Sequence, residues 1–162
     1  MHKPFSPYLN KFITDWFTKN QHLFSQYSEP QFDFNDVNAT FQAFQDHWYS
    51  KGTIPMWYDD NEDNIFASTT VNGMFRAWHD FIHIITGNDF TLQGEINSYE
   101  VQQAFLPADW KYEKSLMKAE IIGQAEFYTA NPKGKIDSQR KFTQNYMKLE
   151  GYYVDFGAGF IS

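Results

Sequence analysis

The chain has 162 residues, the size of one domain, and carries a net charge of −7 at pH 7. Its 13 Lys and Arg residues are scattered, which argues against the basic face that binds nucleic acid. The absence of cysteine excludes disulfides, thiol catalysis and cysteine-type zinc sites. No apolar run is long enough for a signal peptide or a membrane span, so we expect an intracellular protein without a membrane partner.

Apolar residues recur at helical spacing in six segments of the chain. The predicted helices span about residues 7–27, 36–50, 68–86, 93–105, 109–130 and 137–149. No strand is predicted, so the fold class is all-α. We expect a single-domain bundle of five or six helices over residues 1–162, with a core supplied by the aromatic residues, which make up 20 % of the chain.

Four acidic residues lie close together between the second and third predicted helices. The segment Asp59-Asp60-Asn61-Glu62-Asp63-Asn64 has neither the central Gly nor the Glu at the twelfth position of a calcium-binding EF-hand loop. We therefore interpret it as a solvated acidic loop.

The helix predicted over residues 68–86 carries a wide apolar arc and a narrow polar strip. A helical wheel places Val71, Phe75, Trp78, Ile82 and Ile85 in the core arc. The polar strip consists of Arg76, His79, Asp80 and His83. Because His79 and His83 are one turn apart, they can place two imidazoles on one ligand.

Carboxylates accompany apolar residues on the next two predicted helices. Glu95 lies at the edge of the apolar face of helix 93–105. In helix 109–130, Glu120 and Gln124 project within the apolar arc. A carboxylate in that position is costly unless it is paired, hydrogen-bonded or bound to a metal. Glu120 is therefore the most informative single residue in the sequence.

Two histidines and one carboxylate form a ligand set for zinc with an open position or for non-haem iron. We predict that His79 and His83, with Glu95 or Glu120, bind one divalent metal, zinc or iron. Asp80 and Glu120 are the candidate catalytic carboxylates, and Arg76 and Gln124 the candidate residues that orient the ligands. Spacing alone resembles the zincin motif His-Glu-x-x-His, but Asp80 is too short to replace the catalytic Glu of a protease.

Other interpretations of these residues stay open. The pair His79-Asp80 is also typical of HD-type phosphohydrolases, whose earlier histidine could only be His47 here. The two histidines could instead face water or form salt bridges with Glu120, and Arg76 could pair with Asp80 one turn along the helix. The site would then be a polar network that only specifies the core.

Residues 150–162 form an aromatic C-terminal tail that is too apolar for a free end. We expect it to pack across the body of the protein or against a second subunit, which would give a homo-oligomer.

Several of these motifs together resemble an uncharacterised family of tailed-phage and bacterial proteins. The motifs are Arg76-Ala77-Trp78-His79-Asp80-x-x-His83, Gly94-Glu95 and Glu120-x-x-Gly123-Gln124, and the similarity covers about residues 54–128. The family pattern has Val and Gly where this chain has Trp78 and Ile82. The resemblance implies a shared site and a cytoplasmic location in a bacterial or phage-infected host cell, but no particular activity.

These observations lead to two hypotheses about function. In the first, a buried His/Glu metal centre carries out hydrolytic or oxidative chemistry on a small molecule that the sequence does not identify. In the second, a phage-associated structural or interaction protein uses the same residues as a closed hydrogen-bond network. Access separates the two, because a ligand site needs an open cavity.

Overall fold

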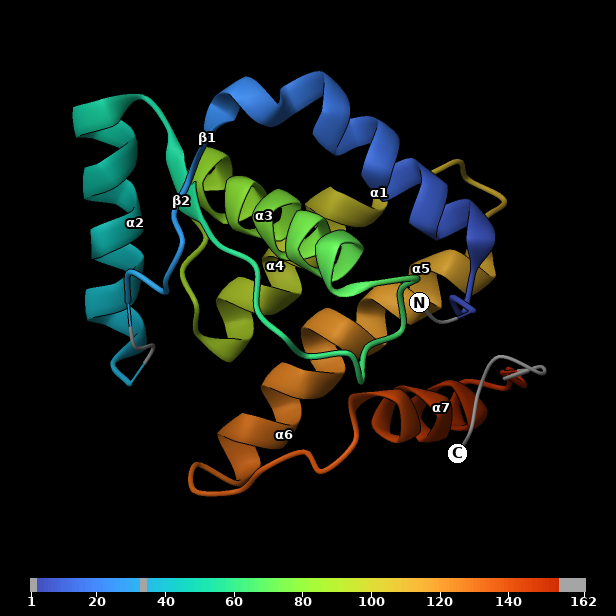
Figure 1. Cartoon of the computed structure of the whole chain (residues 1–162). Helices are drawn as coiled ribbons and strands as arrows, with labels where there is room; N and C mark the ends of the chain where they lie inside the picture. The colour runs from blue at the N-terminus through green and yellow to red at the C-terminus, as the bar shows by residue number, and fades with distance from the viewer. Residues whose placement is uncertain (1–2, 33–34, 155–162) are drawn as a thin grey trace.

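The computed structural model describes residues 3–32 and 35–154, and it confirms the all-α prediction. Helix α3 (Thr69–Thr86) lies at the centre and packs against α1 (Pro7–Asn20) and α4 (Leu92–Gln103). Helix α2 (Val37–Lys51) lies at one end of the molecule (Figure 1). The chain continues through α5 (Lys111–Lys118), a π-helical turn η2 (Ala119–Gly123) and α6 (Gln124–Ala130) to α7 (Gln139–Leu149).

The predicted first helix is shorter than expected, and one short sheet was missed. Helix α1 ends at Asn20, a 3-10 turn η1 (Gln21–Leu23) follows, and β1 (Phe24–Gln26) pairs in parallel with β2 (Ile54–Met56). Residues 24–27 had been assigned to the helix because Phe24 and Tyr27 keep helical spacing. Pairing with a distant strand overrides that local pattern, and three residues are too few for an alternation to be recognised.

Helix α3 is central because its apolar face is wide. Of the predicted core arc, Val71, Phe75, Trp78 and Ile82 are buried, and Trp78 is fully enclosed. Rings from α1 surround the Trp78 indole, with the Phe12 centroid at 5.5 Å and the Trp16 centroid at 5.7 Å. The prediction was wrong for Ile85, which is 48 % exposed near the end of the helix.

The acidic loop is solvated in part, since Asp60, Asn61 and Glu62 are exposed, but its other residues form structural contacts. Asp63 accepts hydrogen bonds from the main-chain nitrogens of Gln139 and Arg140 and so caps α7, while Asn64 is fully buried. The Asp59 carboxylate forms an ion pair with Arg76 of α3. The loop therefore ties α3 to α7 across the molecule.

The beginning of the C-terminal tail packs on the body of the protein, which is one of the two arrangements expected for it. Val154 is buried in the main core, and the ring centroids of Tyr152 and Tyr112 lie 5.6 Å apart. Residues 155–162 lie outside the described part of the chain, so packing against a second subunit stays a prediction. Within residues 3–32 and 35–154, none of the helices combines the length and apolar character needed to cross a membrane.

Candidate metal centre

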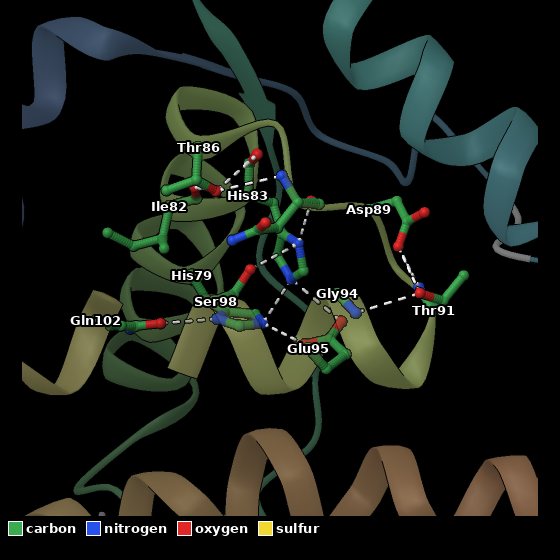
Figure 2. A network of polar contacts seen from close by, with 11 residues as sticks. His79, Ile82, His83, Thr86, Asp89, Thr91, Gly94, Glu95, Ser98 and Gln102 are labelled. Atoms are coloured by element: carbon green, nitrogen blue, oxygen red, sulfur yellow. Dashed lines mark hydrogen bonds and ion pairs between the residues drawn. The ribbon is translucent and has the colours of Figure 1, made fainter. Parts of the chain in front are cut away.

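Helices α3 and α4 bring His79, His83 and Glu95 together, as Figure 2 shows. The two Nε2 atoms lie 2.9 Å apart. Oε2 of Glu95 lies 2.8 Å from Nε2 of His79, and Oε1 lies 3.1 Å from Nε2 of His83. The ligand atoms that the three residues offer all lie within 4.8 Å of one another, so the group can hold a metal ion.

These spacings fit the edges of a compact coordination shell. Two donors about 2.1 Å from one ion are about 3.0 Å apart at a right angle and about 3.4 Å apart at a tetrahedral angle. The observed separations of 2.8, 2.9 and 3.1 Å are close to the right-angle value. Two histidines and one carboxylate on a single face leave the remaining positions open.

The outer nitrogen of each imidazole is held by an oxygen. Nδ1 of His83 lies 2.7 Å from the main-chain oxygen of Asn88, with the hydroxyl of Ser98 at 3.2 Å. Because a carbonyl oxygen only accepts hydrogen bonds, Nδ1 of His83 carries the proton and donates it. Nδ1 of His79 likewise donates to Oε1 of Gln102 at 2.7 Å. Each neutral ring therefore directs the lone pair of Nε2 toward Glu95 and the other ring.

Three acceptors converge in this arrangement, so they need a cation among them. Burial would lower the pKa of His79, but the Glu95 carboxylate, with help from Gln102 and Asp80, outweighs burial and raises it. Burial would raise the pKa of Glu95, but the charge and hydrogen bond of His79, with His83, lower it to about 2. Without a metal, a proton on His79 balances Glu95, and a divalent ion can replace that proton.

The turn between α3 and α4 fixes the position of Glu95 relative to the histidines. Gly87 ends α3 with a left-handed φ of 74°, which Gly adopts without strain, and the chain turns so that the Asn88 carbonyl reaches back to His83. Gly94 packs directly on this turn, since a Cβ there would lie 2.0 Å from the main-chain oxygen of Asp89. Thr91 caps α4 through the nitrogen of Gly94.

Two of the three candidate ligands line a cavity of about 590 Å³. His79 and Glu95 line it, and each side chain is 15 % exposed, whereas His83 is fully buried behind them. Asp80 lines the same cavity, and burial raises its pKa to about 6 despite the nearby His79 and His83. The cluster is therefore open on one side rather than sealed.

Glu120 also lines the cavity, but it does not join the converging ligand atoms of His79, His83 and Glu95. It is buried, as its position in the apolar arc predicted. The carboxylate accepts hydrogen bonds from Gln139 at 2.7 Å, Thr143 at 2.9 Å and Gln124 at 3.0 Å. Burial nevertheless raises its pKa to about 7, because the three hydrogen bonds lower the pKa less than burial raises it and the charge of Asp63 raises it further.

The remaining predicted site residues have other contacts. Arg76 lines the cavity and pairs with Asp59. Gln124 orients the Glu120 carboxylate rather than an imidazole. His47 lies away from the cluster, where Nε2 accepts a hydrogen bond from Tyr27 and Nδ1 donates to the Thr53 carbonyl. The histidine required by the HD-type interpretation is therefore not supplied by His47.

Sequence reasoning missed the residues that orient the two rings, namely Gln102, Ser98 and the Asn88 carbonyl. A signal for two of them was present, because Glu95, Ser98 and Gln102 follow at i, i+3 and i+7 and so share one face of α4. A main-chain carbonyl cannot be recognised from the pattern of side chains.

Comparison of the chain with protein-family models, curated proteins and solved structures returned no match.

Proposed function

We propose that this protein is a metal-dependent hydrolase for a small molecule, with one divalent ion held by His79, His83 and Glu95. The observation that carries the proposal is the convergence of two Nε2 lone pairs and a carboxylate, with both rings oriented from behind, at the wall of an open cavity. A purely structural network needs no such opening.

Each part of the cavity wall has a role in this proposal. A divalent ion supplies Lewis acidity toward water or a substrate oxygen. Gln102 and the Asn88 carbonyl keep the donor nitrogens aimed at the ion. Asp80 follows His79 directly in the chain and lines the cavity beside the donors, so it is placed to accept a proton from the attacking water.

Metal analysis of untagged protein purified without chelators tests the metal-binding half of the proposal. We expect about one equivalent of zinc, iron or manganese per chain, and loss of that metal in the double variant His79→Ala/His83→Ala. His22→Ala and His47→Ala are matched controls, because neither residue lies in the cluster. Protein that neither contains nor takes up a metal would instead support the closed structural network.

Hydrolysis of small chromogenic esters, amides and phosphoesters tests the catalytic half. If Asp80 accepts the proton, Asp80→Asn should lower kcat by about 10²–10⁴-fold and change metal affinity only a few-fold. Activity unaffected by Asp80→Asn would remove Asp80 from the mechanism.

A second candidate is iron-dependent oxidation, favoured by donor separations that match a right-angled facial set. Metal substitution separates the two reactions. Zinc has no redox chemistry, so a zinc-loaded protein that hydrolyses substrate supports the hydrolase, whereas turnover only with iron and dioxygen supports the oxidase.

A further inference from the structure

The cavity beside the metal centre carries more negative than positive charge. Its lining includes the carboxylates of Asp59, Asp80, Glu95 and Glu120. Among the described residues of that lining, Arg76 is the only Lys or Arg, and Asp59 already pairs with it. A bound divalent ion offsets two negative charges and leaves no positive excess. Clefts of this kind concentrate ligands of opposite charge, which argues against an anionic substrate and for a cationic one.

Glu120 is the carboxylate in this cavity that has only neutral partners. It is 9 % exposed, and the salt bridges between described residues do not include it. Oε2 accepts from both Gln124 and Gln139, whereas Oε1 accepts only from Thr143. A carboxylate oxygen has two lone pairs, so Oε1 can accept one more donor. A buried carboxylate with only neutral donors is an uncompensated charge, which a cation that reaches it offsets.

The backbone around Glu120 departs from an ordinary helix at this point. Residues Ala119–Gly123 form a π-helical turn between α5 and α6. Glu120 and Ile121 line the cavity from this turn, and Gln124 lines it from the start of α6. Wide turns of this kind occur often at functional sites, where they change the direction of a side chain.

Apolar and aromatic groups complete the wall. Ile121, Leu92 and Phe90 line the cavity, together with the rings of Phe75 and of Tyr128, which is 44 % exposed. Aromatic faces attract organic cations, and apolar groups bury the hydrocarbon part of such a ligand. The neighbouring cavity of about 400 Å³ shares Gln124 and Tyr128, and its one lysine, Lys135, lies with Asp63 and Asp137. The adjoining space therefore adds no positive excess.

We propose that the cavity binds a small organic ammonium group at Glu120, with the hydrocarbon part of the ligand against Phe90 and Tyr128. The substrate class that follows is a hydrolysable small molecule bearing an amine. This last step rests on the proposed function, whereas the ammonium subsite does not require the metal.

Titration calorimetry with benzylamine, benzyl alcohol and benzoate at pH 8 tests the subsite in the unmodified protein. The three probes share a ring and differ in charge. Because a hydrogen bond between charged groups is stronger than one between neutral groups, benzylamine should bind at least about tenfold more tightly than benzyl alcohol. Benzoate should bind most weakly to protein freed of metal, where its carboxylate has no ion to contact. Equal affinity for the amine and the alcohol would overturn the proposal.

Glu120→Gln should lower benzylamine affinity by at least about tenfold, because it removes one such charged hydrogen bond and keeps the shape. Gln124 and Gln139 can turn their amides to match the new side chain, so the fold should persist. Glu126→Gln is the matched control, since Glu126 is exposed on α6 and outside the cavity lining. Unchanged benzylamine affinity in Glu120→Gln, or an equal loss in Glu126→Gln, would contradict the assignment.

Metal uptake and amine binding fail separately in this design. The double variant His79→Ala/His83→Ala should lose the metal and keep benzylamine affinity within about threefold. Glu120→Gln should keep the metal and lose benzylamine affinity. Amine binding without metal uptake would leave the subsite standing and remove the proposed metalloenzyme. Metal uptake without amine selectivity would remove the ammonium subsite and leave the proposed metal centre standing.

Discussion

His79 and His83 direct their Nε2 atoms at each other across 2.9 Å, one helical turn apart on α3. Neither ring is free to turn away, because Gln102 and the Asn88 carbonyl hold the opposite nitrogens. Glu95 closes the triangle from α4. Two lone pairs and a carboxylate in so small a space require a proton or a metal ion, and this requirement leads to the predictions that follow.

Gln102→Leu should weaken metal binding by about 10–100-fold, the usual effect of losing a residue that orients a ligand imidazole. The side chain fixes the proton of His79 on Nδ1, so its loss lets the proton move to Nε2, where it blocks the metal. Nitrogen-15 spectra of the imidazoles report which nitrogen is protonated. Gln103→Leu is the control, because among the described residues that side chain donates its hydrogen bond to the Glu100 carbonyl and not to an imidazole. An effect of equal size in both variants would mean that α4 as a whole had been disturbed.

Gly94→Ala should lower both stability and metal affinity. The added methyl would meet the Asp89 carbonyl at 2.0 Å, so the α3–α4 turn must shift and carry Glu95 away from the histidines. Overpacking of this kind costs about 1–3 kcal/mol, measured by urea denaturation. Gly52→Ala is the control, because Gly52 has a φ of 70° and an added Cβ there would meet no atom within 4 Å. The backbone strain should lower stability but leave metal affinity unchanged. Retained metal affinity in Gly94→Ala would show that the turn does not position Glu95.

The burial of Glu120 should make stability depend on pH. Its pKa is about 7 in the folded protein against an ordinary 4.5, so the folded state binds this proton more tightly than the unfolded chain. The contribution of Glu120 protonation to the free energy of unfolding is therefore greatest below about pH 4.5. It decreases as pH rises and is lost above about pH 7. It amounts to roughly 3 kcal/mol at about 1.4 kcal/mol for each pKa unit.

Urea denaturation of metal-free protein across pH 4–8 measures this dependence, with Glu120→Gln as the reference. The wild type should lose stability relative to the variant as pH rises through that window. Parallel pH profiles for the two proteins would show that Glu120 has the same pKa folded and unfolded.

Metal binding should release protons, and affinity should fall as pH decreases. Since Glu95 raises the pKa of His79 above its ordinary value of 6.5, protons compete with the metal already near neutral pH. Calorimetry in two buffers with different ionisation enthalpies measures the number of protons released, which we expect to lie between zero and one at pH 7.5 and to increase toward pH 6.5. Metal affinity that does not change between pH 8 and pH 6 would exclude the histidines as ligands.

The sequence predicted the helices well where the apolar pattern was long. The segment 68–86 was predicted within a residue because Ser68 caps it, Gly87 ends it, and the apolar pattern between them is strong. The helix predicted over 109–130 begins at Lys111 and is interrupted by the π-helical turn Ala119–Gly123, which the apolar spacing did not predict.

The burial of His83 and the partners of Glu120 depend on tertiary packing, which the pattern of a single helix does not show. The wheel placed His83 opposite the core arc, yet it is fully buried, because α4 covers that side of α3 and supplies Glu95 and Ser98. The burial of Glu120 was predictable from its apolar neighbours. Its partners were not, because Gln139 and Thr143 come from α7, brought beside η2 by the Asp63 cap.

Titration of metal-free, untagged protein with zinc at pH 7.5 tests the central claim most directly, with Glu95→Gln as the comparison. This substitution keeps the size of the side chain and removes the charge that completes the ligand set. The account predicts one equivalent bound by the wild type and an affinity at least about tenfold lower in Glu95→Gln. Absence of zinc binding, or binding that Glu95→Gln leaves unchanged, would contradict a metal centre at His79, His83 and Glu95.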